Sequence, residues 1–417
     1  HGFRLLLAQA DYNIAYLHLL RGDYLNARAL YDEARRAAVA SGDRYHAAVC
    51  DLDEAELLIE LNLHGDAEEL ARAAVRAFRQ LRLGYEEAKA RVFVALCAGR
   101  QGELKRALQL LQRSRRQFVS EQNAVWPPLI DLYAALLLAQ AGDLIAARQR
   151  GRAALGFFSP TVLPAKAIHC RLLLARIDLQ LGQIRSAEAH SAAAERLLPH
   201  AQSPALAGHT WALKGRIHEA LDHHDAARAH YLRAEKEFEA LRDRLRTEEL
   251  RISFFQDKVA VYESHFRLLI KRDQIPEAFA TAERAKSRNL AAAVTPRRRI
   301  LAGSPEAESR EQLDLLYREL EGAEFDRSPD APARTASLRD RIRRTESDLR
   351  KRRATLPAAA DDSFIPSLEE IFARLPEDAR FLEYFRAGDD LYAFVIGGGR
   401  ATVHQTGSAS RILSLLR

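Results

Sequence analysis

Three cysteines, one of them beside a histidine, are the residues of this sequence with the clearest capacity for nucleophilic chemistry. Cys50, Cys97 and Cys170 each stand alone in segments of helical periodicity, and His169 precedes Cys170. An imidazole can activate a thiolate, but neighbours on a helix point about 100° apart, so this pair makes a poor dyad. Isolated cysteines fit neither a disulfide framework nor a CxxC metal pattern. We therefore expect small buried thiols, with no catalytic residue, no metal and no cofactor.

Two basic runs suggest a nucleic-acid or nuclear-import patch. They are Arg297 to Arg299 and Arg350 to Arg353. Acidic residues are interleaved with them, and the whole chain carries 63 basic and 57 acidic residues for a formal charge of +6. This excess is thin and spread along the chain. A solvated charged face is therefore the favoured interpretation, and nucleic acid is not indicated directly.

The bulk properties are those of a soluble protein with two or three domains. The chain has 417 residues, of which 47% are hydrophobic. Its longest apolar run, "LIDLYAALLLAQAG", contains Asp131 and falls short of the roughly 20 residues that a membrane span needs. We expect no membrane partner, and the lone cysteines favour a reducing cytoplasm.

A repeat runs through the first seven-tenths of the chain. In "RGDYLNARALYDEA", Gly22 is followed by Ala27, Tyr31 and Ala34 at offsets of five, nine and twelve. The same offsets recur in further units roughly forty residues apart, in the range of helical-pair repeats. These units begin at Gly65 (with Leu70, Ala74, Ala77), Gly102 (Ala107, Leu111, Ser114), Gly142 (Ala147, Gly151, Ala154), Gly182 (Ala187, Ser191, Ala194), Asp222 (Ala227, Tyr231, Ala234) and Asp273 (Ala278, Ala282, Ala285).

The repeat resembles the tetratricopeptide repeat (TPR), whose Gly-Asp-Tyr turn and Ala, aromatic, Ala series the first unit matches best. Glycine in the left-handed conformation closes a tight turn after the first helix, and small residues on the second helix let its partner approach closely. The resemblance covers about residues 5–292 and implies an α-solenoid superhelix of seven helical pairs with a concave inner surface. We expect six alanines to be buried at helix crossings: Ala27, Ala107, Ala147, Ala187, Ala227 and Ala278.

Repeats of this kind usually bind a protein or peptide ligand in the repeat groove, although a spacer without a ligand is the alternative. In peptide-binding relatives an Asn often binds the ligand backbone, since its side-chain amide can both donate and accept hydrogen bonds. Asn13 stands at this position, flanked by Tyr12 and Tyr16. Later units hold Glu56, Phe93, Tyr133 and Leu173 instead, so no ladder of asparagines exists.

A second resemblance begins where the repeats end. "ERAKSRNL", residues 283–290, is similar to the segment that closes the repeat array in bacterial TPR-CHAT proteins, which join these repeats to a caspase-like domain. Residues 293–363 are charged and Pro-rich and predict a linker hairpin of two helices. Ser367 and Glu370 then form a capping box before a short helix.

From residue 380 the apolar period changes to two. "FLEYFRA", "LYAFVIGG" and "ATVHQT" predict three strands joined by turns at Gly388-Asp389-Asp390 and Gly397 to Gly399. This meander resembles the first strands of the CHAT domain, and "SASRILSLLR" reads as its first helix. The expected organisation is thus a mainly α protein: repeats over 1–292, the hairpin over 293–363, and the N-terminal part of an α/β caspase-like domain over 364–417.

The resemblance implies the sensor region of a cysteine protease whose nucleophilic Cys and His would lie downstream of Arg417. Nothing here matches those two positions, because His404 lies too early, so this chain by itself should have no protease activity. The alternative is an interaction scaffold with a catalytically inactive CHAT domain. A third interpretation is a transcriptional regulator with a peptide-sensing repeat array. The sequence favours it less, since it contains no helix-turn-helix pattern.

The strands also predict a surface. We expect one apolar face made from Leu382, Tyr384, Tyr392 and Phe394. With an exposed edge, such a sheet is covered by a further segment of the protein, or pairs with another chain, which would cause self-association, or packs on its own repeats.

Overall fold

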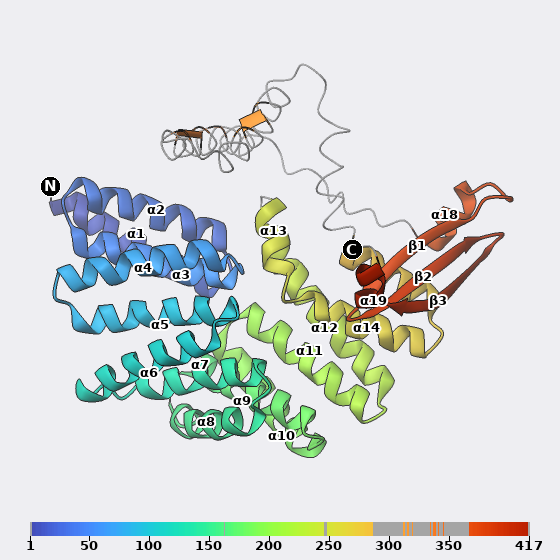
Figure 1. Ribbon diagram of the computed structural model, residues 1–417, viewed down its shortest axis with the longest axis horizontal. Helices are drawn as coiled ribbons and strands as arrows, with labels where there is room; N and C mark the ends of the chain where they lie inside the picture. Colours follow the sequence, from blue (N-terminus) through green and yellow to red (C-terminus); the bar gives the residue numbers. More distant parts are fainter. Residues whose placement is uncertain are drawn as a thin grey trace. The chain divides into compact units, whose positions relative to one another are not determined.

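The computed structural model describes residues 2–161, 163–245, 248–286 and 367–415, with a few isolated positions between 312 and 345 (Figure 1). The chain divides into two compact units, His1–Ala282 with Phe372–Arg417, and Glu283–Ile371. The predicted linker hairpin and most of "ERAKSRNL" lie outside the described residues. Except for the capping box at Ser367 and Glu370, the contacts described below belong to the first unit.

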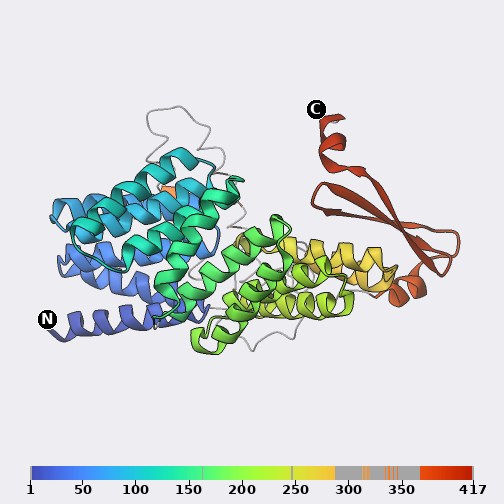
Figure 2. The same cartoon turned by 90° about the horizontal axis from the view of Figure 1, so that it is seen from below.

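Twelve helices of 15 to 20 residues follow one another from the N-terminus as six pairs. Figures 1 and 2 show them stacked as successive layers, which confirms the predicted solenoid of helical repeats. They are α1 (Gly2–Leu20), α2 (Tyr24–Ala40), α3 (Arg44–Glu60), α4 (His64–Gln80), α5 (Gly84–Arg100), α6 (Leu104–Ser120), α7 (Trp126–Gln140), α8 (Leu144–Phe158), α9 (Pro164–Gln180), α10 (Ile184–Ala201), α11 (Pro204–Ala220) and α12 (His224–Asp243).

The helices are joined by turns that recur at a fixed spacing. A residue with positive φ stands at every twentieth position from Gly22 to Asp222, except at position 162, which is not described. After α1, for example, the amide of Gly22 bonds to Leu19 O at 3.0 Å and that of Asp23 to His18 O at 2.9 Å. This pattern closes a helix through one left-handed residue. One helix with its turn therefore takes 20 residues and one pair takes 40.

Small residues fill the crossings between the helices, as expected. All six alanines named from the sequence, from Ala27 to Ala278, are fully buried. At the offset of nine residues, two repeats carry an aromatic side chain, and both of these, Tyr31 and Tyr231, are fully buried. Close helix approach through alanine thus places the larger side chains between the layers.

The predicted register of the second unit is wrong by three residues. Its turn residue is Asn62 (φ 61°), and Gly65 lies exposed inside α4. The offsets of five, nine and twelve from Asn62 reach Ala67, Ala71 and Ala74, which are fully buried, whereas Leu70 and Ala77 are half-buried. Asparagine tolerates the left-handed conformation better than most side chains, so a search for glycine misplaced this turn.

Exchanging Ala67 for leucine should lower the free energy of unfolding by about 1–3 kcal/mol, because a larger side chain at a close crossing forces its neighbours to move. Gly65→Ala should leave it unchanged or slightly higher, because the added methyl group meets no atom within 4 Å. Chemical denaturation compares the two variants. A larger loss for Gly65→Ala than for Ala67→Leu would restore the original register.

The last repeat differs from the others by an additional helix. α13 (Glu248–Phe255) precedes α14 (Val259–Lys271), and residues 275–286 are helical. α14 ends in the same kind of turn, at Asp273 (φ 55°), where the amide of Gln274 bonds to Leu269 O at 2.9 Å. The predicted use of Asp222 and Asp273 in place of glycine is therefore confirmed.

Beyond the repeats, three strands form an antiparallel sheet in the order β1-β2-β3, as predicted. They are β1 (Phe381–Ala387), β2 (Asp390–Gly397) and β3 (Arg400–Ser408), between α18 (Leu368–Arg374) and α19 (Ala409–Leu415). The capping box before α18 is present: Glu370 N donates to Ser367 Oγ at 3.2 Å, and Ser367 N to Glu370 Oε2 at 2.9 Å.

The sheet packs one apolar face on the last repeat, and of the four predicted residues only Tyr392 and Phe394 lie on that face. Phe385 pairs with Tyr392 across β1 and β2, and both are buried with Phe394. Leu382 and Tyr384 lie on the opposite face, 53% and 52% exposed. Leu382 and Tyr384 were predicted to share a face with Tyr392 and Phe394. Alternation within each strand does not reveal the register between strands, and in the structure Tyr392 pairs with Phe385 rather than with Tyr384.

Candidate binding face

Positions that are equivalent in the repeat recur every 40 residues on the first helix of each pair. Tyr16 lies on α1, and successive steps of 40 residues from it reach Glu56 on α3, Leu96 on α5, Leu136 on α7, Arg176 on α9 and Arg216 on α11. Counting from Asn13 gives Asp53, Phe93, Tyr133, Leu173 and Leu213, of which all but the half-buried Tyr133 are buried. The corrected turn at Asn62 thus makes Asp53, and not Glu56, the equivalent of Asn13. We use "inner face" for these two series and for the polar residues that interact with them.

Side chains far apart in the chain interact on this face. Lys166 of α9 has a pKa raised to about 12 by Tyr133, with further contributions from Glu56 and Tyr16. Burial raises the pKa of Glu56, while Lys166 and Lys89 oppose that shift. These polar side chains, from α1, α3, α5, α7 and α9, therefore lie close enough to influence one another's pKa.

The inner face becomes basic toward its C-terminal end. Desolvation, together with the nearby guanidinium groups of Arg216 and Arg100, lowers the pKa of Arg176, and Asp257 opposes this. Burial lowers the pKa of His209 to about 4, and Lys258 adds to the effect. At neutral pH the histidine is therefore uncharged and the arginines carry the positive charge. This end of the face favours anionic groups.

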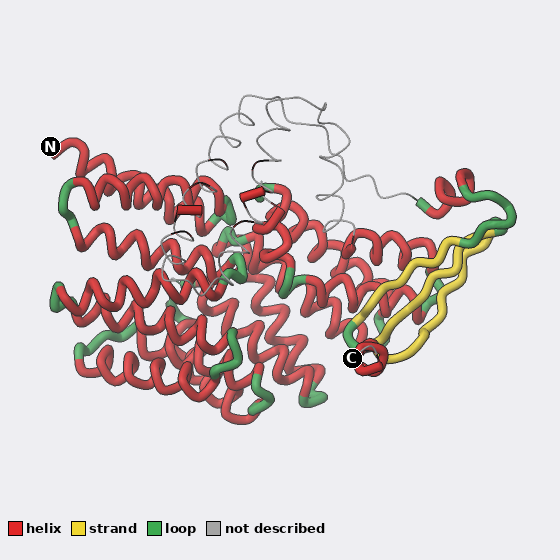
Figure 3. The backbone as a smooth tube through the Cα atoms, turned by 45° about the horizontal axis from the view of Figure 1, so that its top comes forward, coloured by secondary structure: helices red, strands yellow, loops and turns green. Residues whose placement is uncertain are grey.

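Segments from the end of the repeats contact the first two repeats. Asn62 Nδ2 donates to Ser253 O at 3.0 Å and to Asp257 Oδ1 at 2.9 Å, and Ser253 Oγ donates to Leu61 O. The Phe254 ring lies 5.9 Å from that of Tyr24, centroid to centroid. Figure 3 shows the helices of the chain in red and the three strands in yellow. These contacts bring Asp257 and Lys258 to the inner face.

The three residues predicted from the sequence lie together on α1 but differ in environment. The Tyr12 hydroxyl donates to Asp53 Oδ2, and burial raises its pKa. Tyr16 is 40% exposed, and its pKa is raised by burial and by Glu56. Asn13 is exposed, and its side-chain amide has no hydrogen-bond partner among the described residues. Tyr12 therefore holds α1 on α3, whereas Asn13 and Tyr16 are accessible.

Sequence reasoning missed the charged residues of the inner face. Lys89, Lys166, Arg176 and Arg216 come from three different repeats, and no local motif marks them. The signal that could have found the two arginines is the strict 40-residue period, which leads from Tyr16 to both of them. The period was obscured by the misplaced second turn.

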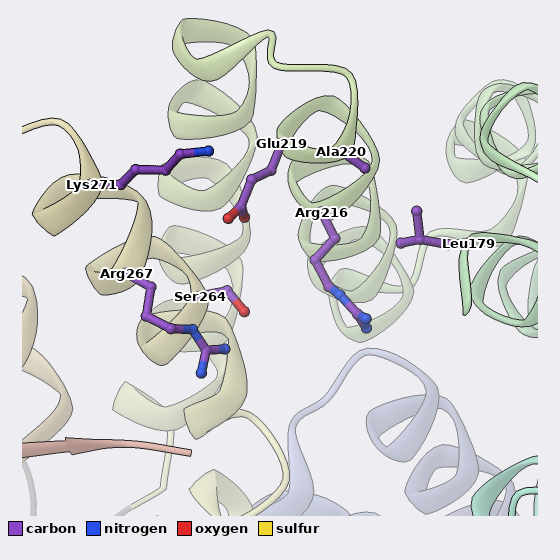
Figure 4. A pocket seen from close by; sticks show the side chains of 7 residues that line it. All are labelled: Leu179, Arg216, Glu219, Ala220, Ser264, Arg267 and Lys271. Atoms are coloured by element: carbon purple, nitrogen blue, oxygen red, sulfur yellow. The ribbon is translucent and has the colours of Figure 1, made fainter. Parts of the chain in front are cut away.

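A pocket of about 390 Å³ lies at the edge of the inner face, between α9, α11 and α14 (Figure 4). Arg216 belongs to both. In Figure 4 the Lys271 and Glu219 side chains point across the space between α14 and α11, and the Arg216 and Arg267 guanidinium groups lie toward the lower part of the view. The lining residues are Leu179, Arg216, Glu219, Ala220, Ser264, Arg267 and Lys271.

The cysteines are structural, as expected. Cys50, Cys97 and Cys170 are buried, and burial raises the pKa of each thiol to about 12. Such thiols stay protonated at neutral pH and are poor nucleophiles. His169 is exposed while Cys170 is buried, so the two adjacent side chains point in different directions.

Two other features can be stated for the described part of the chain. Within it, no group of three or more His, Cys, Asp or Glu side chains is placed to hold a metal ion. Among the same residues, no helix combines the length and apolar character that crossing a membrane requires.

Comparison with known proteins places the fold among TPR-like helical repeat proteins. A scan against family models and a search of curated proteins both found no match. The Rap conjugation gene regulator of the plasmid pLS20, in complex with a Phr peptide, aligns with a TM-score of 0.51 and 13% identity over 70% of this chain and 76% of its own. A Rap protein complexed with Competence and Sporulation Factor aligns with a TM-score of 0.50 and 14% identity over 83% of this chain and 99% of its own.

Proposed function

We propose that the repeats are a sensor that binds a peptide or a protein segment along the inner face. The observation that carries this proposal is that Tyr16, Glu56 and Tyr133, from three other repeats, lie close enough to Lys166 to raise its pKa, while Tyr16 is 40% exposed. Exposed aromatic and charged groups on such a face provide stacking and ion-pair partners for an extended chain. The two Rap proteins that share the fold were determined with a peptide and with a factor bound, which supports a ligand of this class.

We further propose that the sheet is the first part of a CHAT caspase-like domain, which the bound state of the repeats controls. Support comes from the similarity of "ERAKSRNL" and of the strand pair "FLEYFRA" and "LYAFVIGG" to that family. The packing of Phe385 and Phe394 on the last repeat, through Phe266 and Phe279, supplies a physical route. A ligand that binds two arrangements of α14 with different affinity would shift the population of sheet positions.

Peptide binding can be tested with an array of random peptides probed by the purified chain. Tyr16→Ala and Arg176→Gln alter exposed residues at the two ends of the inner face, so both variants should fold. We expect each to weaken binding of the selected peptides at least tenfold. Ile145→Ser is the matched control, because Ile145 is 69% exposed on α8, the second helix of its pair. Equal loss in the control, or no loss in either variant, would contradict binding along the inner face.

Control of a protease is tested in a protein that carries this chain together with the whole of the proposed CHAT domain. Peptide hydrolysis that depends on the selected ligand, and is lost with Arg176→Gln, is the expected result. Ligand binding without hydrolysis under any condition would favour the alternative, an interaction scaffold whose CHAT domain is inactive.

A further inference from the structure

The pocket between α11 and α14 concentrates positive charge that the protein does not neutralise. Arg216 and Arg267 form no ion pair within 4.0 Å among the described residues. Lys271 Nζ lies 3.9 Å from Asp222 Oδ1, but both side chains are largely exposed, so water screens this pair. Three cations thus surround one space with little compensation.

The single acidic group of the pocket is already engaged. Glu219 Oε2 accepts a hydrogen bond of 2.7 Å from the Tyr231 hydroxyl, and Tyr231 is fully buried in α12. One carboxylate against three cations leaves a formal excess of two positive charges. Ser264 Oγ donates to Ala260 O at 2.8 Å, and its lone pairs and rotatable hydroxyl line the same space.

The pocket is also large enough for a compact ligand. About 390 Å³ lies at the small end of the range for ligand pockets in proteins. Two planar guanidinium groups present paired N–H donors in the geometry that matches carboxylate and phosphate oxygens. An uncharged or cationic ligand would leave these donors unmatched.

On its far side, Arg267 reaches the sheet. A methyl group added at Gly388, in the turn between β1 and β2, would come within 3.1 Å of Arg267 Nη1. Gly388 has φ of 64°, a conformation that other residues seldom adopt. The adjacent Phe266 packs on the sheet. A group held by Arg267 would therefore restrain the helix and the turn on which the sheet rests.

We propose that this pocket is a binding site for a small multivalent oxyanion, bearing phosphate or carboxylate groups, that joins Arg216 of α11 to Arg267 and Lys271 of α14. The pocket shares Arg216 with the inner face, but binding of a small anion does not require that a peptide binds along that face. Its occupation would stabilise the contact between the last repeat and the β1–β2 turn.

Calorimetric titration of the whole chain tests the site with pyrophosphate and citrate as probes, at matched ionic strength against sodium chloride. We expect saturable binding of at least one probe and at least tenfold weaker binding in Arg267→Gln and in Arg216→Gln. The stronger probe identifies phosphate or carboxylate as the preferred group. Absence of binding by both probes would overturn the proposal.

Arg272→Gln is the matched control, because Arg272 ends α14 but pairs with Asp225 Oδ1 at 2.6 Å and does not line the pocket. It should bind as the unaltered chain does, and equal weakening would show nonspecific attraction and refute the site. Amide exchange gives a second readout: the bound probe should slow exchange at Gly388 and Asp389 in the unaltered chain and not in Arg267→Gln. Unchanged exchange at these amides on probe binding would refute the link to the sheet.

Discussion

Replacing Phe266 by alanine should release the sheet from the repeats. Phe266 is fully buried, and its ring centroid lies 4.6 Å from that of Phe385, 5.0 Å from Tyr392 and 6.0 Å from Phe394. Truncating a buried phenylalanine costs about 3–5 kcal/mol, and here most of that loss falls on the contact between α14 and the sheet. Hydrogen exchange should become faster throughout β1, β2 and β3, while chemical denaturation records the loss of stability.

Phe118→Ala provides the matched control for this experiment. Phe118 is also fully buried, and it stacks on Trp126 at 5.0 Å between the third and fourth repeats. It should cost a similar free energy of unfolding without selective exchange in the strands. Faster strand exchange in both variants alike would mean that Phe266 does not hold the sheet.

The outcome bears on how a sensor of this kind could act. Under the proposed function, a ligand on the repeats must alter something that the sheet contacts. α14 contacts the sheet through Phe266 and also lines, through Arg267, the pocket that shares Arg216 with the inner face. Coupling through a packed helix requires no moving loop, only two arrangements of α14 with similar free energy.

The repeat architecture could be predicted because its determinants are local. Gly22, Gly102, Gly142 and Gly182 mark turns through backbone conformation, and the buried alanines follow at fixed offsets on the same helix. The turn at Asn62 could not be found by looking for glycine. The left-handed conformation is a minor preference of asparagine that neighbouring residues must support. The turns at Arg82 and Gln122, with φ of 58° and 55°, could not be found by looking for glycine either.

The candidate site could be predicted only in part, because much of it is assembled by long-range contacts. Asn13 and Tyr16 are accessible, as a ligand-binding position requires, whereas Tyr12 is occupied by a hydrogen bond to Asp53, 41 residues away. No local sequence pattern predicts the hydrogen bond between Asn62 and Ser253, which lies 191 residues later. The face of the sheet was likewise settled by strand register, which depends on the pairing partner and not on β1 alone.

Those long-range contacts lead to the second large effect, the expected loosening of α13 in Phe254→Ala. The Phe254 side chain is 1% exposed and lies beside the Tyr24 ring, with Lys258 Nζ 4.0 Å from its centroid. Its loss should cost about 3–5 kcal/mol. The Asn62 side chain would then have to hold Ser253 and Asp257 without apolar support, and hydrogen bonds accessible to water contribute only about 1 kcal/mol each.

We therefore expect residues 248–258 and the turn at 61–63 to lose protection from amide exchange together. Asp257 and Lys258 would leave the inner face, so a peptide selected on the array should associate faster with the variant if α13 limits access to that face. Phe78→Ala is the control, because Phe78 is fully buried in α4 and packs against Tyr45 in the neighbouring helix. The same loss of protection at 248–258 in this control would show that the segment responds to general destabilisation. Unchanged protection in Phe254→Ala would show that the polar contacts of Asn62 and Ser253 alone hold the end of the repeats against their beginning.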